Sequence, residues 1–338
     1  MPSAEPSRAR FALGIDLGGT FIKSAVVSQD GALKKIWKVP TEAGEGGARV
    51  VERLLELCRA MLSELPEGVQ REDIIGLGIG CPGVFDYETG RLVAGAVNLP
   101  GLSGTPLRAV FEERLGLPTR LDNDANVFAL AEARWGAGRG AETLVAYTLG
   151  TGVGGGVVLG GRVFHGAWGF AGELGHFTVE PRGEPCLCGN VGCLEMYASA
   201  NALAIHARKL VQEGAETALS RYPLEAITSK EVGEAAALGD RAALAVIERA
   251  AFYLGIGIAG AVITLNPEII VIGGGAAQLG ERLFGPIREE LNKRVYHHSV
   301  REVPVVGAQL GTDSGMIGAG ALVFAERGEL ERPGAKGS

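Results

Sequence analysis

The feature that most constrains the fold is a pattern of strand, glycine turn and strand that occurs twice in the chain. In the first copy an apolar run, Phe11–Leu17, ends at Gly18-Gly19-Thr20, and a second run, Ile22–Ser28, follows. In the second copy Leu144–Leu149 ends at Gly150-Thr151-Gly152, again with an apolar run behind it. Short apolar runs bounded by glycine predict buried strands. Such a unit is common by itself, but its recurrence at matched places predicts two related halves.

The rest of the chain alternates between helical and strand-like patterns. Residues 48–65 and 315–326 have apolar side chains at helical spacing, whereas 74–80 and 269–272 are short apolar runs next to glycine. Strands separated by helical segments predict an α/β architecture.

The length of 338 residues agrees with two domains of about 150 residues each. We expect a small α/β domain over 11–125, completed by a C-terminal helix at about 312–326, and a large α/β domain over 126–311.

Glycine is in excess, with 53 residues where average usage near 7% would give about half as many. No three-residue period indicates collagen, and 46% hydrophobic residues leave ample material for a core. We therefore expect the surplus glycines, including those of 76–83 and 136–192, to lie where the backbone must approach a ligand closely.

The net charge and the cysteine content limit which partners and which cellular compartment we expect for this protein. A net charge of −7 argues against a nucleic acid partner. Five cysteines without a signal-type N-terminus favour a reducing, cytoplasmic setting in which a cysteine cluster binds metal. The uncharged run Ala250–Leu265 is shorter than the ~20 residues of a membrane span, so it predicts a buried helix and no membrane.

The two glycine turns offer backbone amides and hydroxyls to a polyphosphate. Asp16, Gly18, Gly19 and Thr20 in the first copy, with Thr151 and Gly152 in the second, are the expected contacts. Asp16 also supplies a carboxylate for Mg²⁺ or its water. Neither turn is a P-loop or a dinucleotide fingerprint, because a strand follows each one and not a helix. A third glycine site, around Gly274, could receive a flat base.

The segment Asp122-Asn123-Asp124-Ala125-Asn126 precedes a helical pattern, so one of its polar side chains is expected to be the N-cap. Phosphoryl transfer to an alcohol also needs a carboxylate that accepts the hydroxyl proton. Asp124 is the expected general base.

One histidine and three cysteines form a predicted metal site: His176, Cys186, Cys188 and Cys193. One imidazole and three thiolates are a tetrahedral zinc set, and four protein ligands close the site, so the zinc would be structural. A redox pair or unrelated thiols are the alternatives. Cys58 and Cys81 are expected in the core, His165 as an ordinary loop residue, and His297 and His298 at an exposed helix end.

With these motifs the chain resembles the ROK family of sugar kinases, and within it the bacterial ATP-dependent glucokinases. The resemblance rests on Glu173-Leu-Gly-His176, the Cys186–Glu195 cluster, Asp16-Leu-Gly-Gly-Thr20, Asn123-Asp124-Ala-Asn126 and Gly150-Thr-Gly152, and it extends over about 11–324. It implies an actin-like (ribonuclease H-like, ASKHA) fold of two domains with a central cleft for nucleotide and sugar.

The resemblance further implies ATP-dependent phosphorylation of glucose at the 6-hydroxyl, with Mg²⁺ accompanying ATP. The implied sugar-binding residues are Gly83, Asn98, Asn123, Asp124, Glu173, His176 and Glu195. The implied nucleotide-binding residues are Asp16, Gly18, Gly19, Thr20, Thr151, Gly152 and Gly274. His176 would both bind zinc and contact the sugar. A homo-oligomer, dimer or tetramer, is also implied.

The chain departs from the family pattern at two places. Phe21 stands where many relatives have a lysine, and the lysine here is Lys23. The C-terminal turn at 311–315 is looser than the usual acidic turn, and we assign it no role.

Two alternatives remain open. The acceptor could be mannose, fructose, allose or an N-acetylated amino sugar, because the shared residues would contact hydroxyls common to these sugars. The chain could also be a sugar-sensing repressor of the same family. Such repressors carry a helix-turn-helix domain ahead of the first strand, and only ten residues precede Phe11, which favours the kinase.

Overall fold

The computed structural model describes residues 9–296 and 302–326, and its contacts divide the chain into two compact units. His297 and His298 lie outside the described residues. The first unit comprises the chain up to Glu142, residues 158–171, and the chain from Thr312 on. The second comprises Thr143–Val157 and Gly172–Gly311. This division groups helix α3 (Asp124–Trp135) with the first unit, whereas the domain proposal from the sequence begins the second domain at 126.

The first unit contains a five-stranded sheet in the order β3-β2-β1-β4-β7. Strands β1, β2 and β3 pair antiparallel, and β4 and β7 extend the sheet parallel to β1. The strands are β1 (Phe11–Leu17), β2 (Phe21–Ser28), β3 (Leu33–Pro40), β4 (Ile74–Cys81) and β7 (Thr119–Asn123). A separate hairpin is formed by β5 (Val84–Asp86) and β6 (Arg91–Ala94).

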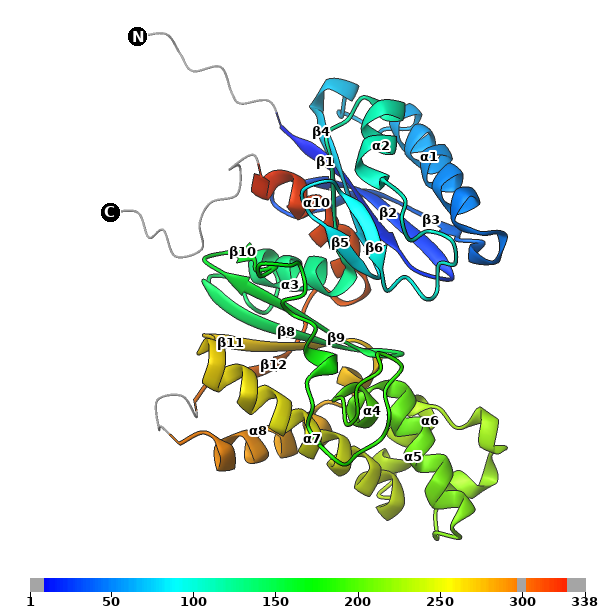
Figure 1. The fold of residues 1–338 in the computed structure, drawn as a ribbon, viewed down its shortest axis with the longest axis vertical. Helices are drawn as coiled ribbons and strands as arrows, with labels where there is room; N and C mark the ends of the chain where they lie inside the picture. The colour runs from blue at the N-terminus through cyan, green and yellow to red at the C-terminus, as the bar shows by residue number, and fades with distance from the viewer. Residues whose placement is uncertain (1–8, 297–301, 327–338) are drawn as a thin grey trace. The chain divides into compact units, whose positions relative to one another are not determined.

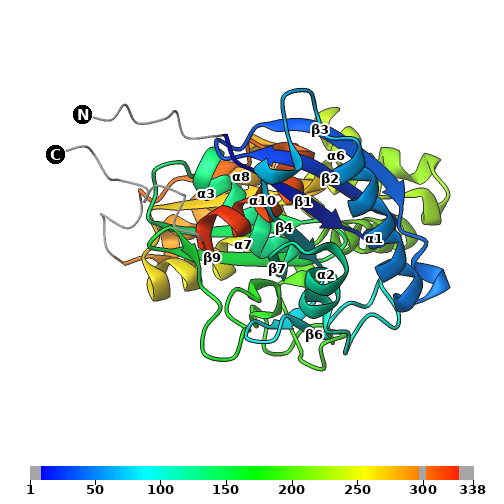
Figure 2. The same ribbon diagram turned by 90° about the horizontal axis from the view of Figure 1, so that it is seen from above.

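Successive side chains along β1 point to opposite faces of the sheet, and this alternation explains which helices cover each face. Leu13, Ile15 and Leu17 belong to a buried cluster with α1 (Gly47–Ser63) and α2 (Leu107–Leu115). Ala12, on the other face, belongs to a smaller cluster with α10 (Ser314–Glu326). Figure 1 and Figure 2 show α1 and α2 next to each other and α10 against β1 and β4.

Glycines bring α10 close to the sheet. A β-carbon at Gly14 would overlap the Met316 carbonyl, and one at Gly78 would overlap the Ala319 carbonyl. Gly318 allows the same approach to α3, where a β-carbon would overlap the Val127 carbonyl. The expectation that the glycines of 76–83 serve ligands is therefore wrong for Gly78, which makes room for a helix.

A second sheet repeats the strand order of the first. It runs β10-β9-β8-β11-β12, so the first two strands of each copy are adjacent and two further strands extend the same side. Most of this sheet belongs to the second unit, whereas β10 and the end of β9 fall within residues 158–171, which group with the first unit. The strands are β8 (Thr143–Leu149), β9 (Val153–Leu159), β10 (Arg162–Val163), β11 (Ile269–Gly273) and β12 (Val305–Gly307). The predicted duplication is confirmed, and both glycine turns connect the first strand of a sheet to the second.

Helices of the second unit pack around α7 (Arg241–Leu265). They are α4 (Glu195–Ala198), α5 (Ala200–Gln212), α6 (Ser229–Ala237) and α8 (Glu281–Arg294). By length and composition α7 could cross a membrane, but 61% of its apolar window is buried within the structure, as in the core helix of a globular protein. The predicted buried helix is thus confirmed, and it begins earlier than expected, at Arg241.

Short 3₁₀ helices complete the description: Ala43–Glu45, Arg71–Asp73, Leu174–His176, Ala218–Arg221, Leu224–Ala226, Gly275–Leu279 and Gly311–Asp313.

Candidate active site

The first glycine turn is fixed by the segment that follows β3. The hydroxyl of Thr41 donates to the carbonyl of Gly18 (2.6 Å), and its backbone amide donates to the carbonyl of Thr20 (2.9 Å). Gly18 and Gly19 therefore present their backbone from a braced turn. A β-carbon at Gly19 would lie 2.9 Å from Cβ of Asn98, so a predicted phosphate contact and a predicted sugar contact are neighbours.

Asp16 lies near the end of β1, beside this turn. Burial raises the pKa of its carboxyl, and the Lys23 ammonium, 4.0 Å away, acts in the opposite direction. Lys23 also donates to the carbonyl of Thr312 (3.3 Å), and a β-carbon at Gly315 would lie 2.6 Å from Cγ of Asp16. The C-terminal turn to which we assigned no role thus contacts the predicted Mg²⁺ ligand.

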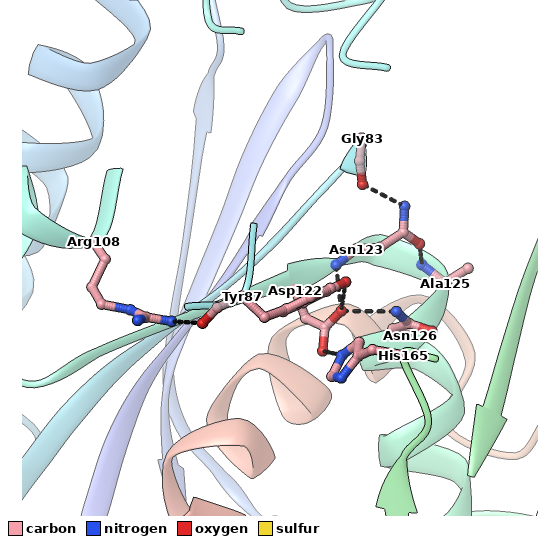
Figure 3. A network of polar contacts seen from close by, with 8 residues as sticks. All are labelled: Gly83, Tyr87, Arg108, Asp122, Asn123, Ala125, Asn126 and His165. Carbon is pink, nitrogen blue, oxygen red and sulfur yellow. Dashed lines mark hydrogen bonds and ion pairs between the residues drawn. The ribbon is translucent and has the colours of Figure 1, made fainter. Parts of the chain in front are cut away.

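Asn123 is the N-cap of α3. Its side-chain oxygen accepts from the backbone amide of Ala125 (2.8 Å), and its side-chain amide donates to the carbonyl of Gly83 (3.0 Å). The prediction that an acid or amide caps this helix is confirmed. Two predicted sugar contacts, Gly83 and Asn123, are therefore bonded to each other (Figure 3).

Asp124 is the first residue of α3, and its side chain is exposed. One carboxylate oxygen accepts from the amide of Ala125 (2.9 Å). The unsatisfied amides and the dipole at a helix N-terminus favour a negative charge on this carboxyl group. An exposed carboxylate in this position can accept a proton from an alcohol.

Asp122 lies behind these residues and is only 1% exposed. Its Oδ1 accepts from the Tyr87 hydroxyl (2.9 Å), the Asn126 side-chain amide (2.8 Å) and the Asn123 backbone amide (2.8 Å). Its Oδ2 contacts Nε2 of His165 (2.7 Å). Figure 3 shows the four partners converging on this carboxylate. We expected His165 to be an ordinary loop residue, and no local sequence signal points to its pairing with Asp122.

The second glycine turn contacts Glu195, the first residue of α4. Glu195 Oε2 accepts from the backbone amide of Val153 (3.0 Å) and lies where a β-carbon of Gly152 would be. Only glycine fits at 152 with the carboxylate in this place. Gly274 adopts φ +87° and packs against the carbonyl of Leu149, which places the third glycine site at the end of β8. The predicted nucleotide residues Gly152 and Gly274 therefore both border the β8–β9 turn.

Glu173 and His176 lie at the two ends of a short turn. Burial raises the pKa of the Glu173 carboxyl; His176 lowers it and Glu195 raises it. Three predicted sugar contacts, Glu173, His176 and Glu195, are therefore close enough to influence one another electrostatically.

The four predicted metal ligands come together. Their ligand atoms all lie within 4.8 Å of one another, with Nδ1 of His176 3.7 Å from Sγ of Cys186 and Sγ of Cys188 3.6 Å from Sγ of Cys193. Two thiolates held about 2.3 Å from one tetrahedral ion lie about 3.8 Å apart, so this set fits one zinc ion. A disulfide would require about 2.05 Å. Cys58 and Cys81 are buried elsewhere in the core, as expected.

Each unit therefore carries its own group of predicted residues. In the first unit Asp16, Gly18, Gly19 and Thr20 share one turn, Gly19 adjoins Asn98, and Gly83 is bonded to Asn123 beside Asp124. In the second unit Thr151 and Gly152 share a turn that contacts Glu195, with Glu173 and His176 nearby.

The repeated sheets, each with a glycine turn after its first strand, define an actin-like fold. The family model of the ROK family matches residues 12–326. The glucokinase of Halalkalibacterium halodurans is 40% identical, over 96% of this chain and 98% of that protein. The xylose repressor of Caldicellulosiruptor bescii is 32% identical, over 93% of this chain and 78% of the repressor.

Among solved structures, a ROK family glucokinase from Streptomyces griseus in complex with glucose and AMPPNP is 33% identical. It superposes with a TM-score of 0.77 over 92% of this chain and 98% of that one. The chain belongs to the ROK family.

Proposed function

We propose that the protein transfers the γ-phosphate of ATP to the 6-hydroxyl of glucose. The observation that carries the proposal is the exposed Asp124 carboxylate at the N-terminus of α3, beside the capping Asn123. Its support from outside the chain is the glucokinase relative at 40% identity and the solved glucokinase that holds glucose and AMPPNP.

In this mechanism the sugar 6-oxygen attacks the γ-phosphorus while the bond from that phosphorus to its bridging oxygen breaks, and ADP leaves with the electron pair. The hydroxyl proton passes to the Asp124 carboxylate, which later releases it to solvent. Gly83, Asn98, Asn123, Glu173, His176 and Glu195 would hold the sugar hydroxyls.

ATP would be held by the glycine turns, with its phosphates at Gly18, Gly19, Thr20, Thr151 and Gly152 and its base near Gly274. Asp16 fits a role toward Mg²⁺, because it is a partly exposed carboxylate beside the first turn. The ion would supply positive charge to the phosphates, and Lys23, which lies 4.0 Å from Asp16, would add to it.

Zinc in the His176–Cys193 set would be structural, since four protein ligands leave no open position. Because Nδ1 of His176 faces Cys186, Nε2 of the same ring is the atom we assign to the sugar.

A coupled ADP-release assay with ATP and Mg²⁺ over a panel of sugars tests the proposal. Asp124→Asn is expected to lower kcat by about 10²–10⁴-fold, the usual contribution of a general base. The matched control is Glu67→Gln, which neutralises an exposed carboxylate distant from Asp124 in the sequence and should keep wild-type kcat. Near-full activity of Asp124→Asn, or no sugar-stimulated ADP release by the wild-type protein, contradicts the proposal.

The same panel separates the alternatives. Turnover that favours mannose, fructose, allose or an N-acetylated amino sugar would reassign the acceptor and leave the mechanism intact. The match to a xylose repressor favours a second candidate, a sugar-sensing regulator. That candidate predicts sugar binding by calorimetry without any phosphoryl transfer.

A further inference from the structure

We propose that His165 is a positioning residue for residues 122–126, which we call the catalytic turn. By fixing the buried Asp122 carboxylate, His165 holds the N-terminus of α3, and therefore Asp124, in place. The inference rests on the proposed function, and it adds to that function a residue distant in sequence from the turn it supports.

Asp122 organises the catalytic turn through one oxygen. Oδ1 receives the backbone amide of Asn123 and the side-chain amide of Asn126, which flank Asp124 on both sides. The carboxylate holds both donors only while its plane keeps one orientation, since a rotation of less than a half-turn about the Cβ–Cγ bond would move an oxygen away from them. Whatever fixes that rotation also fixes the backbone from which Asp124 projects.

His165 fixes the rotation from the other oxygen. Among the described residues, Nε2 of His165 is the one partner of Oδ2, at 2.7 Å. An ionised carboxylate only accepts hydrogen bonds, so Nε2 carries the proton and donates it. Because Asp122 is 1% exposed, leaving its charge without this partner is costly.

The imidazole is itself anchored. Its ring packs against the ring of Tyr87, with centroids 3.7 Å apart and the planes tilted by 35°, and the Tyr87 hydroxyl donates to Oδ1 of Asp122. The backbone carbonyl of His165 accepts from the amide of Ala171 (3.1 Å), which closes the loop that carries it. Arg108 donates to the Tyr87 carbonyl (3.0 Å) and so anchors the backbone of Tyr87 (Figure 3).

The surroundings of His165 permit a chemical rescue experiment. His165 lines a cavity of about 320 Å³, and its side chain is 29% exposed. In His165→Ala, added imidazole can therefore enter the vacated space and donate to Asp122 again.

We expect His165→Ala to lower kcat for sugar phosphorylation by about 10- to 100-fold, the scale of an ångström-sized misplacement of a reacting group. The KM for ATP should stay within about twofold of wild type, since the glycine turns are untouched. Millimolar imidazole should restore most of the lost rate. His165→Gln, whose amide nitrogen can occupy the position of Nε2, should retain more activity than the alanine variant.

Arg162→Ala is the matched control. Arg162 lines the same cavity, and the four partners of Asp122 among the described residues do not include it, so this variant should keep wild-type kcat and ignore imidazole. Hydrogen exchange adds a readout independent of turnover: the amides of 123–126 should exchange faster in His165→Ala and slow again with imidazole.

Wild-type kcat in His165→Ala overturns the proposal, as does a loss that imidazole does not restore and that follows the fraction of folded protein. If the wild-type protein phosphorylates no sugar, the proposed function fails, and this inference fails with it. If the wild type is active but His165→Ala is unaffected, only this inference fails.

Discussion

At the scale of single residues, the environment of Asp16 lowers the stability of the folded protein while serving its proposed function. Burial raises the pKa of this carboxyl more than Lys23 lowers it, so the folded chain keeps the proton to a higher pH than the unfolded chain does. Between the ordinary carboxyl pKa of about 4 and the raised value, the folded state binds more protons, and stability falls as pH rises. Above the raised pKa the folded protein then carries the cost of a partly buried charge.

Asp16→Asn removes that charge. We expect the variant to be more stable than the wild-type protein at pH 7 without ligands, with the difference shrinking toward pH 4, and to lose phosphoryl transfer. Thermal unfolding at both pH values measures the stability part.

Asp30→Asn provides a control of opposite sign. The Ser28 hydroxyl lowers the pKa of Asp30, so its contribution to stability is present above about pH 4 and is lost as pH falls through the lowered value. This second variant should be less stable than wild type at pH 7. A stability gain in both variants would contradict the opposite directions given for the pKa values of Asp16 and Asp30.

Residues also differ in how well sequence alone predicts their role. The four predicted zinc ligands and the cap of α3 lie within short segments, so spacing was enough to predict that the four side chains come together and that α3 begins at a polar cap. His165 and Asp122 are separated by 43 residues, and Lys23 reaches Thr312 across 289. Such pairs form only when segments distant in the sequence pack together. The residues next to each partner have no pattern that predicts the pairing.

At the scale of elements, we expect the loop that carries the predicted zinc ligands, residues 176–193, to connect stability to sugar affinity. His176 belongs both to the ligand set and to the proposed sugar contacts, so loss of one thiolate should disturb both. Cys188→Ser is expected to lose zinc by elemental analysis, to melt at a lower temperature, and to show a raised KM for glucose. Cys58→Ala, a change in the core, should keep its zinc. Full zinc content in Cys188→Ser contradicts the ligand assignment.

The contact between β4 and α10 gives a second prediction at this scale. A β-carbon at Gly78 would overlap the Ala319 carbonyl, so Gly78→Ala should destabilise the protein by about 1–3 kcal/mol through overpacking. Gly285→Ala in α8 is the matched change, because no atom lies within 4 Å of the added carbon. It should be neutral or stabilise by up to about 1 kcal/mol. Chemical denaturation compares the two, and equal effects would argue against close packing of α10.

Elements with a clear period were predicted and several others were not. Helix α1 and strands β1, β4, β8 and β11 agree with their predictions to within a few residues. Strand β7 and helix α2 were not predicted, because β7 ends in polar residues and α2 buries only Leu107 and Phe111. Their positions are set by the sheet they join.

At the scale of the whole molecule, the sequence repeat predicted the architecture better than it predicted the use of glycine. The two sheets share one strand order, as the repeated turn indicated. Part of the glycine surplus, however, lets α10 pack onto β1, β4 and α3, as at Gly14, Gly78 and Gly318. Composition cannot distinguish glycine that admits a ligand from glycine that admits a helix.

The placement of α10 also has a consequence for biosynthesis. This helix spans Ser314–Glu326 yet covers β1, which begins at Phe11, so the first sheet stays open on one face for nearly the whole of translation. The second unit's strands and helices are complete once the ribosome has passed Gly311. The first sheet, although it is made first, can therefore complete its packing only after α10 has been synthesised.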